Sequence, residues 1–185
     1  MAAPTKASEL SLEPGAWNID PAHSAVEFTA RHLVVTKVRG SFSSFTASIE
    51  VAEDVTQSKI SAELDVASIS TGEKDRDGHL KSADFFDVEK FPKITFRSTS
   101  IAPAGNNYAL TGDLNIHGTT RSITLDLEFN GVTKDPWGNI KSGFTATGEL
   151  SRKDFGMEWN APLEGTGVLV SDKIQLSLEI QLVKA

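Results

Sequence analysis

The sequence predicts an all-β fold, an eight-stranded antiparallel barrel with one short helix between strands. Apolar and polar residues alternate with a period of two over most of the chain, which is the period of a half-buried strand. Eight segments carry this pattern, and turn-forming residues separate several of them. A single stretch, residues 73–84, lacks the period and carries the charges of a short exposed helix.

The alternation defines the strands in order along the chain. In the first strand Val26, Phe28, Ala30 and His32 share one face. In the second strand the phase slips at residues 43–44, which indicates a β-bulge. The eight expected strands cover residues 26–32, 38–51, 60–66, 93–97, 108–116, 121–129, 140–150 and 173–182.

Turn chemistry separates the later strands. Residues 103–107 and 135–139 are rich in Gly, Asn, Asp and Pro, and residues 117–120 contain Gly118. Short turns between consecutive amphipathic strands predict antiparallel pairing of neighbours. Eight such strands either form a sandwich or close into a barrel. Closure removes the edge strands, and an eight-stranded barrel has just enough interior for one small ligand.

Two segments outside the strands are candidate covers for a barrel mouth. The helix expected over residues 73–84 contains Gly78, which weakens it, and Phe85 and Phe86 follow it directly. Adjacent phenylalanines beside acidic residues suit a lid or plug. The second segment, residues 152–167, is also irregular. It contains Phe155, Met157, Trp159 and Pro162.

The length indicates one domain, over residues 15–185. Residues 1–14 are small and polar and end at Pro14-Gly15, so we expect a flexible N-terminal tail. They contain no apolar stretch of the signal-peptide kind, and no run of the chain reaches the length of a membrane span. The expected location is the cytoplasm, unless a leader has been removed.

Composition excludes several kinds of site. The net charge is −7 without a basic stripe, which is unsuited to nucleic-acid binding, and no cationic patch for anionic lipid headgroups is evident. There is no cysteine, so disulfides, thiolate nucleophiles and cysteine-based zinc sites are excluded. No two histidines have metal-ligand spacing on one element, and no nucleotide-binding motif occurs. We therefore expect no metal and no cofactor.

The apolar faces of the strands carry many small residues. If these faces point inward the interior is under-filled, because protein interiors normally pack at crystal-like density. The space would be lined by Phe28, Phe42, Phe96, Leu114 and Phe144, as in an apolar ligand site. Alternatively, small residues match large ones across the barrel and nothing is empty. The small residues are Ala30, Gly40, Ala47, Ala62, Ser98, Gly112, Ser142, Ala146 and Gly148.

Few residues suggest chemistry. His32 is in phase with Phe28 and should face the interior, either as a contact for a ligand headgroup or as a hydrogen-bonded core histidine. Acidic residues gather around the expected helix, where a solvated helix face is favoured over acid–base work. They are Asp75, Asp77, Asp84 and Asp87.

Six motifs in order resemble the YceI-like polyisoprenoid-binding proteins. The resemblance runs from about Trp17 to Leu182, nearly the whole chain, and the spacing of the motifs makes it specific. The matching pieces are Trp17-x-Ile-Asp-x-x-His-Ser-x-Val-x-Phe, Val38-Arg39-Gly40-x-Phe, Arg76-Asp77-x-His-Leu-Lys-Ser-x-Asp-Phe-Phe-Asp, Phe91-Pro92-x-Ile-x-Phe, Leu114-x-Ile-His-Gly-Thr-Thr-Arg and Arg152-Lys153-Asp-Phe-Gly.

The resemblance implies a lipocalin-like eight-stranded barrel, often a homodimer, that holds a long isoprenoid or other long-chain lipid. It also implies a role in isoprenoid or quinone metabolism, transport or storage, and it supplies no catalytic residue. Taken with the strand pattern, it favours a cavity. The candidate ligand-binding residues are Phe28, Ala30, His32, Phe42, Leu64, Phe86, Phe96, Leu114, Phe144, Ala146, Phe155 and Trp159.

Two alternatives remain at this point. The protein could be an enzyme that acts on the bound lipid, with His32 or the pair Asp84 and Asp87 as acid–base groups. It could instead be a scaffold module whose barrel is solid and binds nothing.

Overall fold

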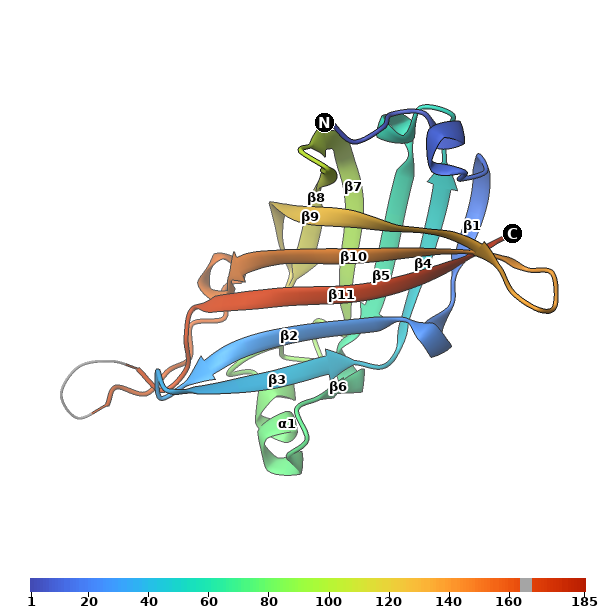
Figure 1. Ribbon diagram of the computed structural model, residues 1–185. Coiled ribbons are helices and arrows are strands. Elements are labelled where there is room, and N and C mark those ends of the chain that lie inside the picture. Colours follow the sequence, from blue (N-terminus) through green and yellow to red (C-terminus); the bar gives the residue numbers. More distant parts are fainter. Residues whose placement is uncertain (164–167) are drawn as a thin grey trace.

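The computed structural model describes residues 1–163 and 168–185, and in these residues one antiparallel sheet closes on itself (Figure 1). The strand order is β1-β4-β5-β7-β8-β9-β10-β11-β2-β3-β6, and β1 also pairs with β11. The strands are β1 (Gly15–Ile19), β2 (Ala25–His32), β3 (Thr36–Phe42), β4 (Phe45–Val51), β5 (Lys59–Asp65), β6 (Ile69–Ser70), β7 (Lys93–Ala104), β8 (Asn107–Ile116), β9 (Thr119–Lys134), β10 (Ile140–Ser151) and β11 (Lys173–Lys184), and the helix is α1 (Lys74–Lys81).

The closed ring contains eight strands, which confirms the predicted barrel. The remaining strands continue members of the ring past short interruptions. β1 and β2 both pair with β11 on either side of residues 20–24. β3 and β4 are separated at Ser43-Ser44, where the phase slip had indicated an irregularity. Along β11 the inward residues alternate with outward ones, as the period of two requires.

The barrel has two layers that cross steeply. In Figure 1 strands β2, β3, β9, β10 and β11 pass in front of β4, β5 and β7. Buried side chains form two clusters, one at each end of the interior. The first surrounds Trp17, which is 1% exposed, and the second surrounds Phe155 and Val66. The space between these clusters contains the candidate site.

The N-terminal segment closes one end of the barrel, whereas the sequence had suggested a flexible tail. Ala7 and Leu12 are buried in the Trp17 cluster. The backbone of Ala3 donates to Gly105 O at 2.8 Å, and the Tyr108 hydroxyl donates to Pro4 O at 2.5 Å. The small residues of this segment allow its backbone to approach the barrel closely. Most of its contacts are backbone hydrogen bonds, which do not depend on residue type, so the alternation of apolar and polar residues could not predict them.

The predicted helix is present as α1. The Glu73 carboxylate caps it by accepting from the backbone N–H of Asp75 and Arg76. Asp77 accepts from the hydroxyl and backbone N–H of Thr71, which ties the helix to the end of β6. α1 and the residues after it cross from β6 to β7 at the lower side of the barrel in Figure 1. Among the described residues, no helix is both long and apolar enough to cross a bilayer.

Candidate functional site

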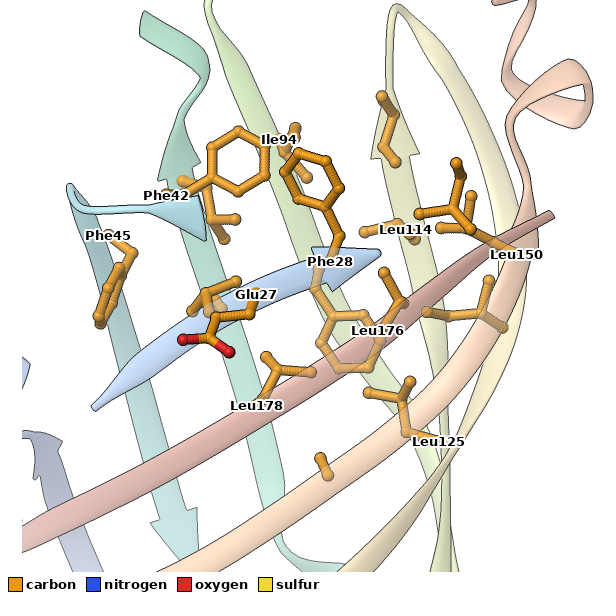
Figure 2. A pocket seen from close by; sticks show the side chains of 18 of the residues that line it. Glu27, Phe28, Phe42, Phe45, Ile94, Leu114, Leu125, Leu150, Leu176 and Leu178 are labelled. Atoms are coloured by element: carbon orange, nitrogen blue, oxygen red, sulfur yellow. The ribbon is translucent and has the colours of Figure 1, made fainter. Parts of the chain in front are cut away.

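The barrel encloses an apolar cavity of about 310 Å³, at the lower end of the range of roughly 300–1,000 Å³ found for ligand pockets. A solid barrel is therefore excluded. Among the described residues 35 line the cavity, and all of these but Glu27, Thr46 and Arg152 are apolar, so they offer it almost no hydrogen-bonding groups. Figure 2 shows Phe28, Phe42, Leu114 and Leu176 reaching one space from four different strands.

The cavity is elongated along β11. The inward face of this strand contributes every second residue from Ile174 to Leu182. At a rise of about 3.3 Å per residue, these eight steps span about 26 Å. The lining therefore suits an extended chain better than a compact molecule. The other β11 lining residues are Leu176, Leu178 and Ile180.

Alanines, not glycines, leave the space open. Ala30, Ala47, Ala62 and Ala146 all line the cavity, and Ala47 and Ala62 are direct cross-strand partners. The expectation that the glycines also contribute space is wrong. Each is covered by a large neighbour: a Cβ would lie 2.2 Å from Phe28 at Gly40, 2.3 Å from Phe96 at Gly112 and 2.6 Å from Leu125 at Gly148.

An aromatic series leads from the cavity to its mouth. The Phe28 and Phe42 rings are 5.7 Å apart between centroids, and Phe42 meets Phe86 edge-on at 6.1 Å. Both distances suit favourable aromatic packing. Phe86 comes from the segment after α1, and it lines the cavity together with Phe85 and Leu80. The two phenylalanines after the helix thus cover the mouth, as the sequence indicated.

The second irregular segment completes this cover. Trp159 packs edge-on against the His79 ring at 4.6 Å and lies 5.4 Å from Phe85. His79 also contacts the Asp84 carboxylate at 2.9 Å. Residues 152–163 therefore close over α1 by ring contacts. The remainder of the expected segment, residues 164–167, lies outside the described residues.

Arg152 holds the mouth segments together. Its guanidinium donates to the backbone carbonyls of Met157 and Trp159 at 2.8 Å and of Ser171 at 3.0 Å, with longer contacts to Val170 O and Asp172 Oδ1. Arg152 is 3% exposed, and this burial lowers its pKa from the ordinary value. All of these hydrogen-bond partners belong to the protein, so we expect the guanidinium to stabilise the fold and not to bind a ligand headgroup.

The strand pairing of the barrel wall is interrupted on one side, and we call this interruption the slot. The last β1–β4 pair is Asn18 with Ser48, and the first β2–β3 pair is Val26 with Phe42. The strand residues between these pairs have no ladder partner across the slot. Thr46 is one of these unpaired residues, and Glu27 follows Val26 directly. Both face outward by their phase but belong to the cavity lining, and Figure 2 shows Glu27 beside its apolar neighbours.

Nine of the twelve candidate residues lie in this lining: Phe28, Ala30, Phe42, Leu64, Phe86, Phe96, Leu114, Phe144 and Ala146. Three lie elsewhere. His32 has the expected phase but is exposed, because β2 extends past the end of the cavity, and Ala30 is its last residue in the lining. Phe155 is fully buried in the solid core, where its carbonyl accepts from His117 Nδ1. Trp159 lies on the outer side of the cover.

Sequence reasoning missed three groups of lining residues. The inward faces of β9 and β11 were visible in the alternation but were not selected. Arg152, Met157 and Val170 lie in turns, where no period predicts burial. Glu27 and Thr46 face outward by their phase, so the alternation excluded them. Asp84 and Asp87, the acid–base candidates, do not line the cavity.

Comparison with known proteins agrees with this geometry. The model of the YceI-like domain matches residues 17–182, from β1 to the end of the cavity lining on β11. The chain belongs to the YceI-like family. Among its relatives is UPF0312 protein SAS2572 of Staphylococcus aureus, 39% identical over 161 residues, which cover 86% of this chain and 92% of that protein.

Solved structures of the YceI-like kind have the same barrel. Burkholderia cenocepacia BcnA superimposes with a TM-score of 0.73 at 26% identity, covering 88% of this chain and 98% of that one. The Campylobacter jejuni YCEI protein gives 0.72 at 30% identity, covering 84% and 90%. A polyisoprenoid-binding domain from Saccharophagus degradans, implicated in plant cell wall breakdown, gives 0.67 at 14% identity, covering 94% and 100%. This last likeness concerns the fold alone.

Proposed function

We propose that this YceI-like protein binds a long apolar or amphiphilic lipid, a polyisoprenoid or another long-chain lipid, inside the barrel. Its role would be carriage or storage of that lipid in isoprenoid or quinone metabolism. The observation that carries the proposal is the elongated cavity with an almost wholly apolar lining. The polyisoprenoid-binding domain of the same fold supports the choice of ligand class.

The energetics are sufficient for specific retention. Each buried CH₂ contributes about 0.8 kcal/mol, so roughly ten to twelve buried carbons supply about 8–10 kcal/mol. A dissociation constant of 1 μM corresponds to about 8 kcal/mol, before the costs of association. No polar group of the protein needs to be desolvated without a partner, because the lining carries so few.

The test is native mass spectrometry of the freshly purified protein, followed by extraction and identification of the lipid. We expect one prenyl or other long-chain species per barrel. If the protein arrives empty, titration with isoprenoid quinones and prenyl alcohols supplies the ligand. Failure to retain any of these would contradict the proposal.

A pair of variants on β5 connects retention to the cavity. Ala62→Phe fills the space beside Ala47, and Ser61→Phe places the same side chain on the exposed outer face of the same strand. We expect Ala62→Phe to lose lipid and Ser61→Phe to keep it, with both variants folded by circular dichroism. Equal retention by both would place the ligand outside the barrel.

An enzyme acting on the lipid is not proposed, since none of His32, Asp84 and Asp87 lines the cavity. Two other expectations stay predictions. Sedimentation over a concentration series tests the homodimer, and fractionation of cells that make the protein tests the cytoplasmic location.

A further inference from the structure

The β2–β3 hairpin presents an apolar tip to solvent. The last strand pair is His32 with Thr36, and the three residues between them are among the most exposed large apolar residues of the described chain. Leu33 is 39%, Val34 60% and Val35 78% exposed. Val168, 40% exposed, lies close to them, because Leu33 N–H donates to Leu169 O at 3.0 Å. In Figure 1 the hairpin extends beyond the barrel at the lower left.

The residues at this tip are poor choices for the turn. Leu33 has φ 54° and Val34 has φ 65°, a left-handed conformation that Gly and Asn adopt far more readily than Leu or Val. For a β-branched residue such as Val34 it is a genuine outlier. Neither folding nor solubility accounts for apolar, β-branched residues here. Strain of this kind, held at an exposed site, is typical of a functional segment.

Cations flank the apolar tip on one face of the hairpin. Arg31 and Lys37 are direct cross-strand partners, and Arg39 lies two residues further along the same outer face. None of the three forms an ion pair with a residue that the structure describes. The cross-strand register brings together a small basic cluster on a chain of net charge −7, although the sequence showed no cationic patch.

Two acidic residues lie on neighbouring elements. Glu27 is on the outer face of β2, two positions before Thr29, the partner of Arg39. Asp172 is already occupied by Lys153 at 3.3 Å and by Arg152. Among the residues that the structure describes, the three cations of the tip therefore remain in excess over the carboxylates of Glu27 and Asp172.

We propose that the tip of the β2–β3 hairpin docks on a bilayer that contains anionic phospholipid. Leu33, Val34 and Val35 enter the interfacial region, and the basic side chains behind them contact the headgroups. Apolar insertion combined with electrostatic attraction is the usual basis of reversible peripheral binding. The charge complementarity selects the anionic bilayer as the occupant over a second copy of this acidic chain.

Docking here would place the cavity mouth at the membrane. Ala30 of β2 lines the cavity and lies three residues before Leu33. Val170 also lines the cavity and lies two residues after Val168. Arg152 holds the Val170 segment to the mouth cover through its contact with Val170 O. A chain leaving the bilayer would thus have a short path into the barrel. This purpose rests on the proposed lipid binding, whereas the docking itself does not.

The test is cosedimentation with vesicles of phosphatidylcholine alone and of phosphatidylcholine with 30% phosphatidylglycerol. We expect the protein to bind the anionic vesicles, with binding that weakens as salt is raised. The variant Leu33→Asn/Val34→Gly installs residues that adopt positive φ readily, so it should fold at least as well as the parent. We expect at least a tenfold loss of vesicle binding in this variant and a similar loss in Arg31→Gln/Lys37→Gln.

The matched control is Trp137→Ser. Trp137 is 84% exposed at the β9–β10 turn, near the far end of β11, and its removal should leave binding unchanged. Absence of parent binding, or an equal loss with Trp137→Ser, would overturn the proposal. A second result would also overturn it: the parent sediments as a dimer and does not bind vesicles, and the Leu33→Asn/Val34→Gly variant sediments as a monomer. The tip would then join two copies of the protein.

Lipid binding is measured separately in the same variants. Loading from detergent solution, followed by native mass spectrometry, requires no membrane contact. If a variant no longer binds vesicles but still retains lipid, the loss concerns docking alone and not lipid binding in the cavity.

Discussion

The ring of Phe28 lies across the backbone of Gly40, its direct partner on the neighbouring strand. Phe96 also covers a glycine, Gly112, although its direct cross-strand partner is Leu114. In each pair the absence of a side chain on the glycine leaves room for the ring beside the neighbouring strand. The glycines therefore keep the cavity open indirectly, by accommodating large rings.

Replacing Gly40 should test this arrangement. The Cβ of Gly40→Ala would lie 2.2 Å from the Phe28 ring, so the ring must turn into the cavity. We expect a loss of about 1–3 kcal/mol in the free energy of unfolding and weaker lipid retention. Urea denaturation and native mass spectrometry measure the two effects.

Gly78→Ala is the matched control. Gly78 is in α1, and a Cβ there meets nothing within 4 Å. We expect this change to stabilise the protein by about 0.5–1 kcal/mol, since alanine favours helix interiors. Unchanged stability in Gly40→Ala would show that the Phe28 ring can move without cost.

Asp20 should make the stability of the protein depend on pH. Its carboxylate accepts from His23 Nδ1 at 3.0 Å, Lys141 Nζ at 3.1 Å and Gln181 Nε2 at 3.0 Å. These hydrogen bonds, that from His23 first, lower the pKa of Asp20 from 3.8 to about 2. The unfolded chain then binds more protons between pH 4 and pH 2, so the stabilisation is complete above pH 4 and is lost as the pH falls to 2.

The expected size of this contribution is about 2 kcal/mol, because one pKa unit corresponds to 1.36 kcal/mol. Asp20→Asn should be less stable than the parent at pH 6 and should approach it at pH 2. Urea denaturation at several pH values measures both proteins. A constant difference between them over this range would assign the role of Asp20 to neutral hydrogen bonding.

Arg152 should be among the most sensitive positions outside the strands. In Arg152→Met the carbonyls of Met157, Trp159 and Ser171 lose their donor, and each unsatisfied buried group costs about 1–3 kcal/mol. We expect a loss of at least about 3 kcal/mol. Hydrogen exchange should rise first in residues 157–163 and 168–172, because the guanidinium joins these segments.

The control for Arg152 is its exposed neighbour. Lys153 makes a surface ion pair with Asp172 at 3.3 Å and is 51% exposed. Lys153→Gln should change stability by less than about 1 kcal/mol. A comparable loss in both variants would mean that charge near Asp172, and not the buried carbonyl contacts, stabilises the mouth.

The strand alternation predicted the strands of the ring, because one rule repeats along each of them, but it left a sandwich and a barrel open, and the family resemblance implied the barrel. Phe42, Leu114 and Phe144 could be placed in the lining for the same reason. His32 could not, since phase gives the face of a strand and not the point at which the strand leaves the cavity.

Other features depend on contacts that have no period. The N-terminal segment is tied down by backbone hydrogen bonds, and Arg152 is buried by the carbonyls of turns. An arginine in an irregular segment ordinarily indicates surface, so no pattern distinguishes this one. The slot next to Glu27 lies where the β1–β4 and β2–β3 ladders end, and these two points meet only in the folded barrel.

Trp159 should control how quickly lipid leaves the barrel. Its ring rests on His79 and Phe85, which joins the segment after β10 to the segment after α1 over the mouth. Trp159→Ala removes this contact without changing the cavity lining, because Trp159 does not belong to it. Affinity differences within one site usually appear in the dissociation rate. We expect release of bound lipid to acceptor vesicles to become about tenfold faster, while the lipid still binds.

The control Trp137→Ala removes an exposed tryptophan remote from the mouth and should leave the rate unchanged. Equal release rates for Trp159→Ala and the parent would show that the contacts of Trp159 with His79 and Phe85 do not limit release.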